Sequence, residues 1–149
     1  MGGARMKVNE NQIASEKYKD IIVKELEFVI NKINQSPTRE EKLYYFSAVQ
    51  GVLNRILNLE YTEQLLSAFY ITNETLKMFH QRLASFKAGD KSINLTDEQL
   101  LRLSQITVEF LETIRNDGNV EEVLKKYVVL LYSTTGNGYY LMEKGVLKI

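Results

Sequence analysis

The side chains that carry most enzyme chemistry are scarce in this chain. His80 is the only histidine and there is no cysteine, which excludes thiolate nucleophiles, disulfides, iron–sulfur clusters and cysteine-based zinc sites. Neither the Glu-x-x-His spacing of di-iron bundles nor the His-x-x-x-His spacing of zinc enzymes occurs. We therefore interpret His80 as a partly buried or exposed residue on the flank of a helix.

Paired carboxylates and clustered glycines also have simpler explanations than catalysis. The pairs Glu40-Glu41 and Glu121-Glu122 fall in expected first turns of helices, where acidic residues favour the helix dipole. Glu109 and Glu112 share a polar helix face. The run Gly136-Asn137-Gly138 lacks the further glycine of a dinucleotide fingerprint and is typical of a turn. The sequence thus predicts a non-enzymatic protein with no catalytic residue, cofactor or metal site.

Length and charge limit the protein's class. The 149 residues include nineteen basic and nineteen acidic side chains, so no global field attracts nucleic acid or anionic membrane. No apolar run reaches the length of a membrane span, and the first residues lack the apolar core of a signal peptide. We expect one cytoplasmic helical domain over 1–149, with a flexible leader at 1–10.

Apolar residues recur at helical spacing in five stretches, and residues at their ends mark the boundaries. The first stretch covers 13–34 and stops before Pro37, the only proline. Ser36 then suits the N-cap of a second helix with Pro37 at its first position. This second helix is expected to run to Leu59.

The later boundaries are marked by caps. Thr96-Asp97-Glu98-Gln99 is a capping box that opens the fourth helix. That helix is expected to end at 116–118, with Gly118 in the left-handed conformation. Asn119 caps a fifth helix over 120–131. All five stretches together predict an all-α bundle of about five helices.

The second helix is apolar over most of its circumference. Residues 43–59 contain one charge, Arg55, and their apolar residues form two adjoining rows rather than one stripe. Such a helix must be covered on more than one side, by the chain's own helices or by another molecule. Gly51 lies inside it and costs about 1 kcal/mol relative to alanine, so we expect a neighbouring backbone to approach closely there.

The C-terminal region is ambiguous in sequence. Residues 128–132 fit either the end of the fifth helix or a buried strand. Beyond them, 139–142 and 146–149 are predicted to form a small hairpin joined by Glu143-Lys144-Gly145, so 134–149 is a possible hairpin extension.

The stretch 62–87 fits one helix, or two helices with a turn at Ile71 and an N-cap at Thr72-Asn73. In the second form, 65–83 resembles a helix-turn-helix, although Leu66 and Tyr70 stand where that motif prefers a small residue and a glycine. The resemblance implies DNA binding in the major groove and at phosphates. The contacts would then come from Asn73, Lys77, His80, Gln81, Arg82 and Lys87.

We therefore expect a small helical subunit or adaptor that self-associates or docks into a larger assembly. Aromatic residues supply much of the anchoring at protein interfaces. The alternatives are a helix-turn-helix DNA-binding regulator or a helical accessory subunit of a nucleoprotein complex, which would make nucleic acid the partner. The candidate interface residues are Tyr44, Tyr45, Val52, Tyr61, Tyr132, Tyr139 and Tyr140.

Overall fold

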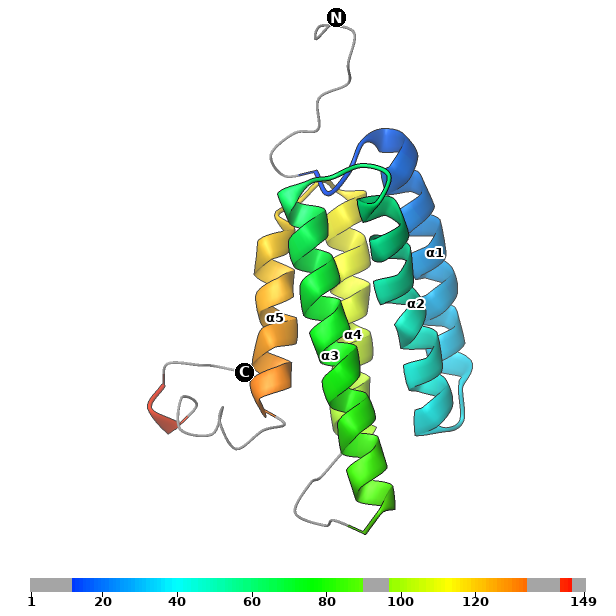
Figure 1. Ribbon diagram of the computed structural model, residues 1–149, viewed down its shortest axis with the longest axis vertical. Coiled ribbons are helices and arrows are strands. Elements are labelled where there is room, and N and C mark those ends of the chain that lie inside the picture. The colour runs from blue at the N-terminus through cyan, green and yellow to red at the C-terminus, as the bar shows by residue number, and fades with distance from the viewer. Residues whose placement is uncertain (1–11, 90–96, 134–142, 146–149) are drawn as a thin grey trace, which may run out of the picture.

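The computed structural model describes residues 12–89, 97–133 and 143–145, and the chain forms five long α-helices (Figure 1). In chain order they are α1 (Glu16–Gln35), α2 (Arg39–Leu57), α3 (Glu63–Lys87), α4 (Asp97–Arg115) and α5 (Val120–Ser133). The predicted all-α bundle is confirmed. Within the described ranges, no helix combines the length and apolarity needed to span a membrane.

The helices pack side by side in a closed ring. α1 packs on α2, α2 on α3, α3 on α5 and α5 on α4, which returns to α1. α5 therefore lies between α3 and α4, and it runs parallel to α3 (Figure 1). The C-terminal end of α3 projects beyond the neighbouring helices in the same view.

Large buried rings from different helices meet at the centre of the bundle. Tyr127 of α5 is fully buried, with its ring centroid 6.2 Å from that of Phe46 on α2 and 6.1 Å from that of Phe110 on α4. Each fully buried aromatic side chain removes a large apolar area from water. These rings thus join three helices through one contact cluster.

α2 is covered by the chain's own helices. Its buried residues span a wide arc, from Leu43 and Phe46 on one side to Val52 on the other. α1 and α3 flank α2, and α4 also touches it. The apolar residues of this helix are therefore largely covered inside the bundle, while its outward side, which includes Glu40, Tyr44, Ala48 and Arg55, stays exposed.

The residues before α1 close one end of the bundle. Ile13 and Ala14 are buried, and the Ile13 carbonyl accepts a hydrogen bond from the Thr62 hydroxyl at 2.6 Å. The backbone N–H of Ser15 donates to the Glu60 carboxylate at 2.7 Å. Residues 13 and 15 are thus bonded to the loop between α2 and α3.

Two helix ends differ from the predictions. Thr38, not Ser36, caps α2 by accepting a bond from the Glu41 N–H at 3.1 Å. Ser36 instead ends α1, because its hydroxyl donates to the Lys32 carbonyl at 2.6 Å. Since α2 starts at Arg39, Pro37 lies before the helix rather than at its first position.

The end of α4 is a Schellman motif whose left-handed residue is Asp117 (φ 54°), not Gly118 as predicted. The N–H groups of Asp117 and Gly118 donate to the carbonyls of Ile114 and Thr113. A Cβ at Gly118 would lie 3.2 Å from the Thr113 methyl group, a tight contact that the threonine side chain would have to relieve by a small shift. Asn119 caps α5 as predicted, accepting from the Glu121 N–H at 3.0 Å.

α3 is one continuous helix of 25 residues. The turn that a helix-turn-helix needs at Ile71 is therefore absent. Thr72, the possible N-cap, lies inside the helix and is fully buried, where its hydroxyl donates to the Ala68 carbonyl at 2.8 Å. Bonding back to the preceding turn lets a threonine occupy a helix interior without an unsatisfied hydroxyl.

The C-terminal ambiguity is resolved in part. α5 continues to Ser133, so 128–132 are helical and not a strand. Residues 143–145 form a turn in which Gly145 has φ 75°. The strands predicted at 139–142 and 146–149 lie outside the described residues, as do the leader at 1–10 and the Thr96 cap of α4.

The buried hydroxyl pair of Thr107 and Tyr127 gives an asymmetric stability prediction. Thr107 Oγ1 donates to the Leu103 carbonyl at 2.8 Å and lies 2.7 Å from the Tyr127 hydroxyl. Because the single threonine proton is already used, Tyr127 must be the donor. Burial raises the pKa of the Tyr127 phenol far above its ordinary value, so the donor stays protonated.

Thr107→Val should therefore cost about 1–3 kcal/mol in the free energy of unfolding, since it leaves the tyrosine hydroxyl buried without an acceptor. Tyr127→Phe should cost about 1 kcal/mol or less, because Thr107 keeps its bond to Leu103. Urea denaturation measures both, and the double variant should be more stable than Thr107→Val alone. A threonine variant as mild as the tyrosine variant would contradict this hydrogen-bond direction.

Candidate interaction surface

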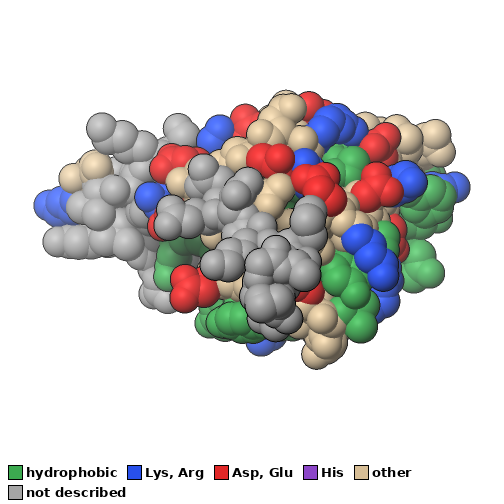
Figure 2. Space-filling view, turned by 90° about the horizontal axis from the view of Figure 1, so that it is seen from above, with side chains coloured by type: hydrophobic (Ala, Val, Ile, Leu, Met, Phe, Trp, Pro, Cys, Tyr) green, Lys and Arg blue, Asp and Glu red, His purple; other side chains and the backbone are tan. Residues whose placement is uncertain are grey.

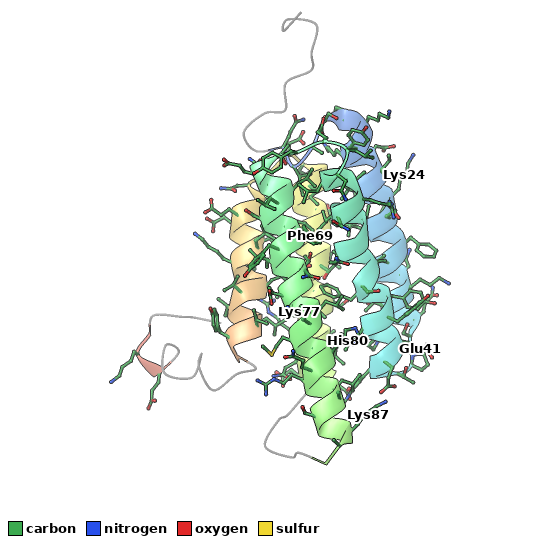
Figure 3. All side chains as sticks on the ribbon, viewed as in Figure 1. Lys24, Glu41, Phe69, Lys77, His80 and Lys87 are labelled. Atoms are coloured by element: carbon green, nitrogen blue, oxygen red, sulfur yellow. The ribbon has the colours of Figure 1, made fainter. Side chains whose placement is uncertain are left out.

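Glu109 and Glu112, two of the acidic residues considered for chemistry, lie in surface ion pairs. Lys126 holds both oxygens of the Glu109 carboxylate, at 3.1 and 2.9 Å, and Arg115 pairs with Glu112. His80 is an exposed residue of α3 (Figure 3). Among the described residues, no group of three or more histidine, aspartate or glutamate side chains is placed to hold a metal ion.

One ion pair secures the far end of α3. The Lys87 ammonium lies 2.9 Å from the Glu40 carboxylate in the first turn of α2. The hydrogen bond from Lys87 lowers the pKa of Glu40 below its ordinary value. Figure 3 shows Lys87 at the end of α3 that projects beyond the bundle.

Among the described residues, five of the nine exposed large apolar side chains lie on α2, α3 and the loop that joins them, and these five are between 44 and 69% exposed. The other four lie on α1, α4 and α5. We call the set of five the α2–α3 apolar face, and it consists of Tyr44, Leu59, Tyr61, Leu66 and Tyr70. Figure 2 shows apolar patches at the edge of the bundle, with Lys and Arg interspersed among Asp and Glu, so neither sign of charge dominates that view.

On α2, small residues lie next to the exposed Tyr44 of this face. A Cβ added at Gly51 would meet nothing within 4 Å, so no described residue makes the predicted close backbone approach. Ala48 is exposed, and the Ser47 hydroxyl turns back to the Tyr44 carbonyl of its own helix. The exposed ring of Tyr44 thus stands at one end of a shallow strip of small residues.

The candidate interface residues fall in different environments. Tyr44 and Tyr61 are among the most exposed side chains, and Tyr132 is exposed on α5. Val52 is fully buried between the helices, where it cannot contact a partner. The remaining three are Tyr45, which is half-buried against the core with its ring 5.2 Å from that of Tyr44, and Tyr139 and Tyr140, which lie outside the described residues.

Sequence reasoning missed three members of the face. Leu66 and Tyr70 lie four residues apart on α3, away from its buried row of Leu65, Ala68 and Thr72. Their i,i+4 spacing off the core register is a usable signal. The third is Leu59, which the apolar pattern assigns to the second helix, whereas α2 ends before it.

The residues proposed for DNA contact are spread along a straight helix. Lys77 pairs with Glu74 on the same helix at 3.7 Å, and Lys87 is held by Glu40. Asn73 and Arg82 are half-buried, whereas Gln81 and His80 are exposed. Because α3 has no turn, no separate recognition helix presents these side chains.

A groove of about 540 Å³ runs between the parallel helices α3 and α5. Its lining mixes apolar residues such as Ile71 and Val128 with Glu63, Glu121 and Lys125. Charges of both signs line it, so it shows no preference for one class of ionic ligand.

Comparison with known proteins does not assign this chain to a family. No protein-family model, no curated protein and no solved structure matches this chain.

Removing the amine of Lys87 should raise the pKa of Glu40. In Lys87→Met the carboxylate loses its strongest stabilising contact, so Glu40 should titrate closer to its ordinary range in an NMR pH titration. Because the folded-state pKa is lowered, the pair stabilises the protein above the unfolded-state pKa, and this contribution is lost as pH falls through the folded-state value. Lys77→Met, which leaves the Lys87–Glu40 pair intact, is the control. An unchanged Glu40 titration in Lys87→Met would refute the assigned cause.

Proposed function

We propose that the protein is a non-enzymatic helical subunit whose role is assembly, and that it self-associates through the α2–α3 apolar face. The observation that carries this proposal is the concentration of exposed apolar side chains on that face. Contiguous exposed apolar surface on a folded chain marks interaction sites more often than isolated residues do. Tyrosine suits such a site because its ring is apolar and its hydroxyl tolerates water.

Two further features support self-association. The core is complete without the face, because α2 is already covered by α1 and α3, so the exposed rings are not needed to fold the chain. The formal net charge of zero means that two copies approach each other without overall repulsion.

Light scattering over a concentration series tests the proposal. The wild-type mass should rise with concentration above that of one chain. Leu66→Ser with Tyr70→Ser should lower this association without lowering stability, because both side chains are exposed. Leu101→Ser is the matched control, since Leu101 is 58% exposed and lies on α4, which contributes no residue to the face. A wild-type chain that remains monomeric at every concentration would contradict self-association.

A further inference from the structure

We propose that two copies of this chain pair through their α2 helices, antiparallel to each other, about a two-fold axis that passes between Ser47 and Ala48. The inference rests on the self-association proposed above and names its surface, its partner and its register. It pairs Tyr44 of each copy with Gly51 of the other, and Glu40 of each copy with Arg55 of the other.

The open stripe of α2 has the spacing that such a pair needs. Glu40, Tyr44, Ala48, Gly51 and Arg55 follow one another at intervals of three or four residues, so they lie on one face of the helix. The buried residues of α2 lie outside this stripe. In a two-fold interface every contact occurs twice, because residue i meets residue j and j meets i. The stripe must therefore complement itself when read in reverse.

Size is complementary in this register. Tyr44 is 69% exposed, so its ring projects from the helix. Gly51 offers the matching space, since a Cβ added there would meet nothing within 4 Å. A glycine in a helix interior costs about 1 kcal/mol in helix stability relative to alanine. Contact with the tyrosine ring of the second copy would offset this cost.

Charge is complementary in the same register. One end of the stripe carries an acid, Glu40, and the other end carries a base, Arg55. The two copies therefore place opposite charges together at both ends of the contact. Each residue already has one partner, since Glu40 pairs with Lys87 and Arg55 with Glu25, so the contact extends two existing pairs. Such exposed pairs fix register and orientation more than they add affinity.

The centre of the stripe allows the helices to approach. Ser47 and Ala48 are small, and the serine hydroxyl is satisfied by its own helix through the Tyr44 carbonyl. The paired helices therefore desolvate little polar surface at the axis. Phe28 of α1, 58% exposed, lies one turn from Glu25, which contacts Arg55, and extends the apolar surface beside α2.

These features favour a second copy over an unrelated partner. A different protein would need to match the stripe in one orientation only. In that case the two ends of the stripe would not have to carry opposite charges. A face that is large opposite small and acidic opposite basic about its own midpoint meets the requirement of a two-fold pair.

Gly51→Gln tests the tyrosine contact. Glutamine is a better helix former than glycine and meets open space in the single chain, so the variant should fold with unchanged or higher stability. It should weaken association by about tenfold or more, because it fills the space for the partner's ring. Leu101→Gln on α4 adds the same side chain elsewhere on the surface and should leave association unchanged. Sedimentation equilibrium measures the dissociation constant, and circular dichroism checks folding.

A charge exchange tests the register. Arg55→Glu should weaken association because it places two acids together at both ends of the contact. Adding Glu40→Arg in the same chain restores opposite charges across the axis and should recover most of the lost affinity. Within one chain the double variant breaks both existing pairs, so a purely intramolecular role for these residues predicts no recovery.

The outcomes separate this inference from the proposed function. Loss of association in Gly51→Gln and recovery in the double charge variant support the α2 pairing. Association that persists unchanged in Gly51→Gln, or no recovery in the double variant, overturns the pairing and leaves self-association by another part of the face. A wild-type chain that is monomeric at every concentration overturns both.

Discussion

The fold depends on covering α2, a helix with apolar residues over most of its circumference. α1 and α3 flank α2, and its buried residue Phe46 contacts the ring of Tyr127 on α5. A helix of this composition cannot remain in water on a broad side. α1 and α3 therefore cover most of its apolar residues, and the outward side of α2, which carries Tyr44, Ala48 and Arg55, remains exposed.

The buried threonines of the core bond to their own helices, so their hydroxyl groups are satisfied without a break in the helix. Thr72, Thr75 and Thr107 are fully buried, and each donates its hydroxyl to a carbonyl four residues earlier on its own helix. Thr72 and Thr75 therefore need no partner from another helix, whereas Thr107 also accepts a hydrogen bond from the Tyr127 hydroxyl of α5. This explains why α3 passes uninterrupted through a sequence that also fits a turn.

The proposed role in assembly rests on the distribution of charged and apolar side chains on the surface. The ionisable groups that might have converged on a site are spread over different helices, where they join neighbouring elements, as Glu40 does with Lys87 and Glu109 with Lys126. Three of the exposed aromatic side chains, Tyr44, Tyr61 and Tyr70, lie on α2, α3 and their connecting loop, whereas Phe28 and Tyr132 lie on α1 and α5. Paired charges maintain the bundle, and apolar groups remain available on its outside.

Sequence alone determined the helical class, the positions of the five helices and the N-cap of α5, because these follow from local periodicity and from side chains that bond within one turn. Tertiary structure decided what pattern cannot express: that α5 lies between α3 and α4, that Val52 is buried whereas Tyr44 is exposed, and that Gly51 faces open space. Val52 and Tyr44 are both apolar residues of one helix, and only the positions of α1 and α3 distinguish them. Burial depends on neighbours distant in the chain, so the identity of the exposed face was set by packing.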